Sequence, residues 1–277
     1  MKLSYSTWGM KTTPVDVAIR HCANLGFDGL ELTIIPGWPT DAAGLTKADR
    51  LSIRQQYDDA GLELCGFSGN IDLLAADWES VRATFCGYLD LAAEMQKAGE
   101  HRIVTTTSGG TADEWEMTQH EIAERLGVVS AYAHRVGVMV GIEPHVGSSV
   151  HLPEHAIWMM EQVASPGLTL HFDISHFNVQ GIPMAESIRL LAPHALHTHV
   201  KDERGLAPDH QFLIPGEGDM DYAGYLREMS DAGYSGHIVV EISLMVQARP
   251  NYDALSAATQ SYNILSAAFQ EAQIGRT

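Results

Sequence analysis

Short apolar segments recur along the chain, and longer segments with helical spacing separate them. The apolar segments are rich in β-branched residues and lie between turn signals, which is typical of strands. Several of the helical segments end at a glycine suited to a helix C-terminus, such as Gly26 and Gly61. The predicted strands span residues 2–7, 27–33, 62–68, 102–107, 138–144, 168–175, 196–202 and 237–243. The predicted helices span residues 14–25, 45–60, 77–98, 113–136, 153–164, 183–191, 222–232 and 251–272.

The predicted strands and helices alternate strictly, and strand starts are mostly about 30–40 residues apart, the size of one βα unit. This rhythm predicts an α/β fold, a closed (β/α)8 TIM barrel. An open doubly wound sheet fits less well because it would leave edge strands unpaired. A Rossmann site is not indicated either, because no GxGxxG motif follows the first predicted strand. Without any linker or low-complexity run, we expect residues 1–277 to form a single TIM-barrel domain.

The last four predicted strands share one pattern of alternation. Each has an apolar face, and the opposite face carries an acid or a histidine near the C-terminal end of the strand. These residues are Glu143, Asp173, His199 and Glu241. In a (β/α)8 barrel the helices cover the outside, and functional groups collect at the carboxyl ends of the strands. We therefore expect the four side chains to point inward and meet at the mouth of the barrel.

Three carboxylates and one imidazole make a hard, oxygen-rich set of ligands that suits Mn²⁺, Mg²⁺ or Co²⁺ and accepts Zn²⁺. A single inward glutamate is usually a satisfied polar residue, but four such groups at one depth repel unless they are paired or bind a cation. A salt-bridge network is the alternative, and Lys201 is the main cation available inside the barrel. His171 and His197 lie deeper, and we expect them to be core histidines that hold ligand carboxylates.

A bound ion with two open coordination positions suggests a chemistry for this site. A sugar can bind through two adjacent oxygens, and the metal then polarises its carbonyl and stabilises an enediolate. A ligating carboxylate can take the proton from the neighbouring carbon. The ligand set therefore favours proton abstraction next to a metal-bound carbonyl.

Composition and charge narrow the range of partners. The chain has 277 residues, of which 45% are hydrophobic and 19% charged, as in ordinary globular proteins. Its formal net charge of -18, with 17 lysines and arginines in all, argues against nucleic acid as a partner. No apolar run is long enough for a membrane span or a signal peptide, so we expect a cytoplasmic protein. Cys22, Cys65 and Cys86 are widely spaced and odd in number, which predicts reduced thiols.

Five motifs in the second half carry a family resemblance. They are Glu143-Pro144, HFDISHF at 171–177, HTHVKD at 197–202, PGEGDMDY at 215–222 and VVEIS at 239–243. In order and spacing they resemble the sugar phosphate isomerase/epimerase family of the xylose-isomerase-like TIM-barrel superfamily. That superfamily includes ketose 3-epimerases, hydroxypyruvate isomerase, inosose dehydratase and endonuclease IV. The first half of the chain matches only in rhythm.

The resemblance implies that the four residues at the barrel mouth bind one divalent metal ion, with Mn²⁺ as the first choice. It also implies that Glu143 and Glu241 form the acid/base pair on opposite faces of the substrate. His176 resembles the histidine that contacts the substrate oxygens. In the ketose 3-epimerases an arginine follows the histidine ligand by six positions. Here that position is Gly205, and Arg204 lies one residue earlier, so the sequence departs from the 3-epimerase pattern.

Four further residues are candidates for substrate binding. Lys201 shares the inward face of its strand and is suited to anchoring a substrate oxygen, acting as an acid, or holding a ligand carboxylate. His145 either faces the site or caps its loop. Glu31 ends the second predicted strand and is suited to contacting substrate or a ligand. Trp8 follows the first strand and offers an apolar wall for a sugar, although packing under a loop is the commoner use.

These features favour a metal-dependent isomerase or epimerase of a small keto-sugar or keto-polyol, working through an enediolate. The rival is a lyase or dehydratase of the inosose dehydratase or 3-keto-glycoside type on the same site, with Lys201 or His145 as the acid. DNA repair is disfavoured because the endonuclease IV branch needs three zinc ions and a basic surface. A non-catalytic sugar-binding barrel is disfavoured by the complete ligand set. Homodimers or homotetramers are compatible with the resemblance.

Overall fold

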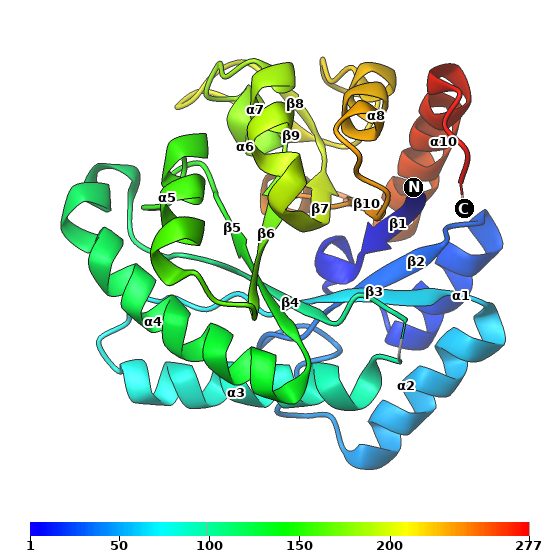
Figure 1. Ribbon diagram of the computed structural model, residues 1–277. Coiled ribbons are helices and arrows are strands. Elements are labelled where there is room, and N and C mark those ends of the chain that lie inside the picture. The colour runs from blue at the N-terminus through cyan, green and yellow to red at the C-terminus, as the bar shows by residue number, and fades with distance from the viewer. Residues whose placement is uncertain (98, 277) are drawn as a thin grey trace.

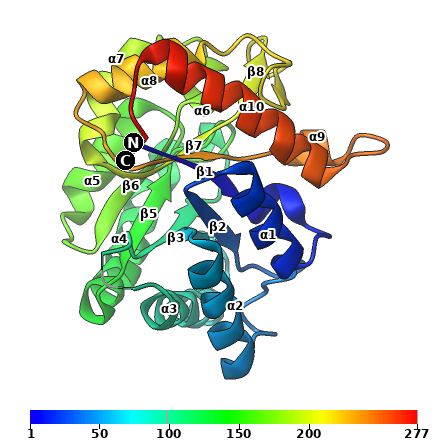
Figure 2. The same cartoon turned by 90° about the vertical axis from the view of Figure 1, so that its right-hand side faces the viewer.

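Eight parallel strands close into a barrel in the computed structural model, which describes residues 1–97 and 99–276. The strands follow the order β1-β10-β7-β6-β5-β4-β3-β2, and the helices surround them (Figures 1 and 2). The predicted (β/α)8 fold is therefore confirmed. The barrel strands are β1 (Lys2–Ser6), β2 (Gly29–Thr33), β3 (Glu63–Ser68), β4 (Ile103–Thr107), β5 (Met139–Glu143), β6 (Leu168–Asp173), β7 (Ala195–Val200) and β10 (His237–Val240).

The long helices follow the predicted segments closely. They are α1 (Val15–Leu25), α2 (Lys47–Ala60), α3 (Trp78–Met95), α4 (Trp115–Val136), α5 (Pro153–Val163), α7 (Met184–Leu191), α8 (Tyr222–Asp231) and α10 (Ala254–Ala272). The chain also forms three short 3-10 turns among the described residues, η1 (Thr7–Met10), η2 (Ala112–Glu114) and η3 (Ala192–His194). Gly26 and Gly61 end their helices with φ of +95° and +68°, as predicted. Ala98, the predicted last residue of the third helix, lies outside the described residues. None of the described helices is long and apolar enough to cross a membrane.

The strict alternation predicted for the last third of the chain is wrong. Four additional elements follow the C-terminal ends of the last strands. They are the short helix α6 (Ser175–Asn178), the antiparallel pair β8 (Asp202–Arg204) and β9 (Gln211–Leu213), and the short helix α9 (Leu244–Gln247). As a result the predicted strands run too far, and Glu241 lies one residue beyond β10. At β6 the cause is local, because the Asp173 carboxylate accepts hydrogen bonds from the backbone and hydroxyl of Ser175 and starts α6.

The two different faces predicted for the last four barrel strands are found in β5, β6, β7 and β10. Residues such as Val140, Ile142 and Phe172 are fully buried in the hydrophobic core. The opposite faces carry polar side chains into the barrel, including Ser6 and His197, which are also buried. The polar interior is therefore a consequence of the strand pleat, and it ends at the mouth where the candidate ligands lie. The predicted thiols Cys22, Cys65 and Cys86 are all free in the described structure.

Candidate metal and substrate site

The four predicted ligands meet at the barrel mouth. Glu143 ends β5, Asp173 ends β6, His199 lies in β7, and Glu241 follows β10. Ligand atoms of Glu143, Asp173 and His199 all lie within 4.8 Å of one another. Oε1 of Glu241 lies 3.7 Å from Nδ1 of His199. The side chains come from four strands that are neighbours in the closed sheet, in the order β10-β7-β6-β5, so they surround one point.

His199 is oriented by a buried carboxylate. Its Nε2 lies 3.1 Å from both carboxylate oxygens of Glu31, which also accepts a 2.5 Å bond from Ser6 Oγ. His197 Nε2 lies 2.6 Å from the same carboxylate. Nδ1 of His199 is buried without a hydrogen-bond partner among the described residues and faces Glu241. A carboxylate bonded to one ring nitrogen leaves the other free for a metal, so Nδ1 is the candidate ligand atom.

Glu31 fits one of its two predicted roles, because it contacts the candidate ligand His199. It is fully buried and lies behind His199, so the predicted contact with substrate does not fit. Burial opposes its charge, but His199 and His197 hold the pKa of Glu31 well below its usual value. Burial would likewise lower the pKa of His199, yet Glu31, with Glu241 and Glu143, raises it to about 9. The two side chains therefore form a buried ion pair beneath the candidate metal site.

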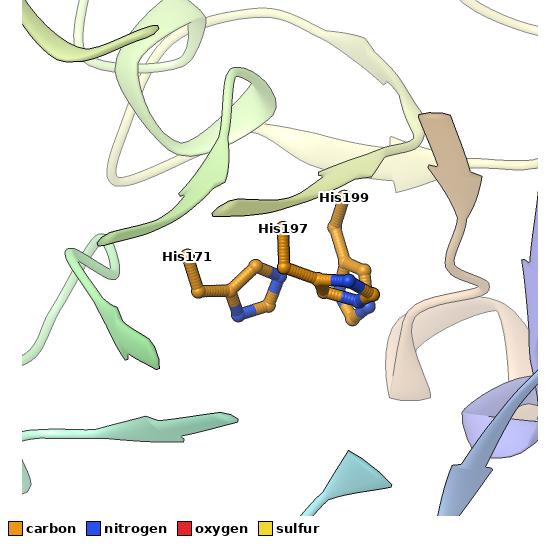
Figure 3. Close-up of side chains that lie close together, drawn as sticks. All are labelled: His171, His197 and His199. Atoms are coloured by element: carbon orange, nitrogen blue, oxygen red, sulfur yellow. The ribbon is translucent and has the colours of Figure 1, made fainter. Parts of the chain in front are cut away.

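Two histidines that lie deeper in the barrel, His171 and His197, are close to His199 (Figure 3). His171, His197 and His199 offer nitrogen atoms that lie within 4.8 Å of one another, and the His171 and His199 rings pack edge to face at 4.2 Å. We expected His171 and His197 to hold ligand carboxylates. Instead His197 bonds Glu31, and His171 Nδ1 is 3.9 Å from Glu143, beyond hydrogen-bond length. His197 thus supports the site indirectly, because it bonds the Glu31 carboxylate that orients His199.

Lys201 pairs with two of the candidate ligands. Its ammonium group is buried, donates a 2.5 Å hydrogen bond to Asp173 Oδ2, and also bonds Glu241. The second Asp173 oxygen accepts from Ser175 N at 2.9 Å and Ser175 Oγ at 2.6 Å. Burial opposes both charges, but the pairing keeps the pKa of Asp173 below and that of Lys201 above their ordinary values. This geometry matches the predicted role of Lys201 as a partner that holds ligand carboxylates.

Glu143 is the carboxylate with the weakest pairing. Its nearest cationic candidates are His176 Nε2 at 3.6 Å and His171 Nδ1 at 3.9 Å. Burial raises the pKa of Glu143. His145 opposes this shift, whereas the nearby carboxylates of Glu241 and Asp173 add to it, so that the pKa is about 7. A carboxyl group with a pKa near neutrality can both accept and donate a proton at physiological pH. Glu143 therefore has the properties of a general acid or base.

The donor set fits a divalent ion. His199 Nδ1 and both ring nitrogens of His176 are buried without hydrogen-bond partners among the described residues. Buried polar atoms in native proteins are rarely left unpaired, so these atoms indicate a missing partner. Two or three carboxylates beside one imidazole are the ligands that Mn²⁺, Mg²⁺ or Zn²⁺ accept. The ligands Glu143, Asp173, His199 and Glu241 are thus compatible with the predicted metal.

A cavity of about 260 Å³ opens beside two of the candidate ligands, Glu143 and Glu241. It is lined by Trp8, Asn70, Thr107, Glu143, His145, His176, Lys201, Phe212, Glu241, Ser243, Leu244 and Met245. Four predicted substrate contacts, Trp8, His145, His176 and Lys201, are therefore at the cavity. Burial lowers the pKa of His145 to about 4 and of His176 to about 3, so both rings are neutral at pH 7. Their rings lie 3.9 Å apart and offer polar nitrogens to a neutral substrate.

Sequence reasoning missed several residues of the cavity wall. Phe212 comes from β9, Leu244 and Met245 from α9, and Asn70 and Thr107 from the ends of β3 and β4. Leu244 and Met245 directly follow a predicted strand end, and that position was an available signal. Phe212 had no such signal, because a three-residue strand carries too little alternation to recognise.

Binding of Mn²⁺ will release protons, since both Glu143 and His199 must be deprotonated to act as ligands. With pKa values of about 7 and about 9, we expect more protons to be released at pH 7 than at pH 8.5. Affinity for the ion will consequently rise with pH. Titration calorimetry in buffers of different ionisation enthalpy measures the number, and a binding heat independent of the buffer would contradict it.

Comparison with known proteins places the chain in a family. Fructoselysine 3-epimerase of Escherichia coli O157:H7 is 27% identical over 271 residues, covering 93% of this chain and 96% of that protein. Inosose dehydratase of Clostridium perfringens (strain 13 / Type A) is 24% identical over 144 residues, covering 47% of each chain. An IolI protein solved with a bound zinc atom superposes with a TM-score of 0.77 at 18% identity, covering 98% of this chain and 99% of that one.

The family model agrees with these similarities and with the predicted resemblance. The model described as xylose isomerase-like TIM barrel matches residues 19–261, which include every barrel strand except β1. The chain therefore belongs to the xylose isomerase-like TIM barrel family.

Proposed function

We propose that this chain is a divalent-metal-dependent epimerase or isomerase of a keto-sugar or keto-polyol. The observation that carries the proposal is the convergence of Glu143, Asp173, His199 and Glu241 beside one cavity. Similarity to a fructoselysine 3-epimerase over almost the whole chain supports the same class of reaction. The substrate is a small sugar-like molecule bound in that cavity.

The four convergent side chains would hold the ion, with His199 contributing Nδ1. Mn²⁺ is the predicted choice, and Mg²⁺, Co²⁺ and Zn²⁺ suit the same donors. When bound, the ion supplies a Lewis acid that polarises the substrate carbonyl and acidifies the neighbouring C–H. The protein supplies the groups that accept and return the proton.

Glu143 and Glu241 are suited to that exchange because they approach from different sides. Their strands, β5 and β10, are separated by β6 and β7 in the closed sheet. A substrate carbon between them can lose its proton to one carboxylate and regain a proton on the opposite face from the other. The neutral rings of His145 and His176 are placed to hydrogen-bond the substrate oxygens.

A dehydratase or lyase is the second candidate on the same site. It is favoured by the similarity to inosose dehydratase, and by the position of Arg204. The guanidinium group of Arg204 donates to the Glu217 carbonyl at 2.6 Å on the protein surface, so it does not serve as the arginine of the ketose 3-epimerase pattern. Elimination begins with the same proton removal and then needs an acid beside the departing oxygen. The Lys201 ammonium, which lines the cavity, could supply it.

Incubation in D₂O tests the proposal. The Mn²⁺-loaded protein will be given D-psicose, fructoselysine, an inosose and methyl 3-keto-glucoside, and the products followed by NMR. We expect deuterium at the carbon beside the carbonyl in at least one compound. Appearance of a second epimer identifies an epimerase, and loss of water identifies a dehydratase. If no compound exchanges while the metal is bound, the proposed function is wrong.

A further inference from the structure

An apolar rim surrounds the outer part of the cavity. It consists of Trp8 from η1, Phe212 from β9, and Leu244 and Met245 from α9. Leu244 and Met245 are each 50% exposed, which is unusual for two consecutive large apolar side chains. Beneath the rim the lining turns polar. The site therefore has two zones, a polar floor for sugar oxygens and an apolar edge with no polar function.

Hydrogen bonds and a buried side chain hold the outer part of the rim in place. Ser243 Oγ accepts a 3.2 Å bond from Met245 N and begins α9, and Val246 is fully buried beneath. The Gln247 amide donates to the carbonyls of Trp8 at 3.1 Å and Ile242 at 2.8 Å. These contacts fix α9, which lies in the projecting segment between β10 and α10 in Figure 2. The exposure of the two apolar side chains is therefore built into the fold.

Aromatic side chains form the rest of the rim. The Phe212 ring lies 5.2 Å from the Lys201 ammonium group and 5.2 Å from the His176 ring, so it borders the polar floor directly. Trp8 stacks on Trp38 with ring centroids 4.7 Å apart, which keeps its indole in one orientation. Rigid aromatic surfaces bury apolar ligand groups at little entropic cost.

The charges of the cavity argue against a phosphorylated or carboxylated substrate end. Among the described residues that line it there is no arginine. Its one ammonium group, on Lys201, is already bonded to Asp173 and Glu241. An anionic group at the rim would meet apolar side chains and face two glutamates below. The rim therefore suits a neutral, apolar group.

We propose that the rim binds an apolar substituent carried by a neutral keto-sugar or keto-polyol. The substrate class is thus an alkyl or aryl glycoside whose sugar ring carries a free ketone, in place of a free or phosphorylated sugar. A cavity of about 260 Å³ is below the roughly 300–1,000 Å³ of pockets that enclose drug-sized ligands. It encloses the sugar ring, and the substituent extends over Leu244 and Met245. This inference rests on the proposed function.

A series of alkyl 3-keto-glucosides tests the inference on the Mn²⁺-loaded protein by titration calorimetry. We expect affinity to increase about fourfold with each methylene, or about 60-fold from methyl to butyl. The double variant Leu244→Ser/Met245→Ser should reduce this butyl preference to about threefold. Met117→Ser is the matched control, because Met117 is 77% exposed on α4 and does not line the cavity.

The outcomes separate this inference from the proposed function. Equal affinity for methyl and butyl compounds, or tighter binding of a 6-phosphorylated compound, overturns the apolar rim and leaves deuterium exchange as the independent test of catalysis. If the double variant changes the oligomeric state measured by sedimentation, a second copy covers the rim and the inference is wrong. If none of the 3-keto-glucosides binds to the metal-loaded protein, this inference is wrong, and deuterium exchange in a free keto-sugar still decides the proposed function.

Discussion

Replacement of Glu143 by glutamine will lower kcat/KM by about 10³-fold and leave the fold intact. The amide can neither accept the substrate proton nor provide an anionic ligand, so both parts of the proposed role are lost together. Stability should change little, because the Glu143 carboxyl has no short ion pair and burial already raises its pKa to about 7. Steady-state kinetics on the substrate identified by deuterium exchange, with thermal unfolding beside it, measures both effects.

Glu203→Gln is the matched control for Glu143→Gln. Glu203 is also a buried acid whose pKa burial raises, to about 8, and its Oε1 accepts a 2.8 Å bond from Asn178. It does not line the cavity. We expect its kcat/KM to stay within about twofold of the wild type. A comparable loss in both variants would show that removing a buried carboxyl, and not proton transfer by Glu143, explains the effect.

Replacement of Glu31 by glutamine will lower the free energy of unfolding by about 3–5 kcal/mol, because it leaves the buried His199 without its counter-charge. It should also weaken Mn²⁺ binding by about 10–100-fold, since the carboxylate that orients a metal-bound imidazole is lost. Urea unfolding measures the first effect and titration calorimetry the second. A variant that binds the ion normally would show that Glu31 does not position His199.

The stability effect of Glu31→Gln depends on pH in a defined direction. The pKa of Glu31 is depressed when folded, so its contribution is present above the unfolded value of 4.5 and falls in acid. The pKa of His199 is raised from 6.5 to about 9, so its contribution is complete below 6.5 and disappears as pH rises through 9. The difference between variant and wild type should thus be greatest between roughly pH 4.5 and 6.5.

Glu63→Gln provides the control for that ion pair. Glu63 also bonds a histidine, with His237 Nε2 at 3.0 Å, and it pairs with Lys2, but its side chain is 38% exposed. Solvent screens such pairs, so its replacement should cost less than about 1 kcal/mol. Equal losses at Glu31 and Glu63 would mean that burial is not what makes the Glu31 pair strong.

The alternation of side chains was sufficient to bring the candidate ligands together from sequence. A residue's face follows from its parity in the strand, and parallel barrel strands end at the same rim. This reasoning was enough to predict the positions of Glu143, Asp173 and His199, because each lies on the polar face near a strand end. Glu241 was found although it lies beyond β10, because the extended chain keeps its direction for one residue.

Contacts between distant segments limited what the sequence could predict. Glu31 and His197 are 166 positions apart, and no local pattern shows that one holds the other. The β8–β9 pair is likewise fixed at a distance, since the Asp202 carboxylate accepts from the backbone of Gly216 at 2.7 Å and Met220 at 3.1 Å. A strand of three residues shows too little alternation of apolar and polar residues to be predicted from sequence, and contacts with distant residues decide where it lies. The position of Phe212 over the cavity was therefore inaccessible to sequence reasoning.

Lys201 bonds Asp173 and Glu241 without an ion, so we expect the chain to fold in the absence of metal. Acidic groups crowded at one point would otherwise repel and open the mouth until a cation arrived. Zinc fingers illustrate that dependence, because they remain unfolded in the absence of zinc. Here an internal ammonium group pairs with two of the acids, so we expect folding to precede binding of the proposed ion.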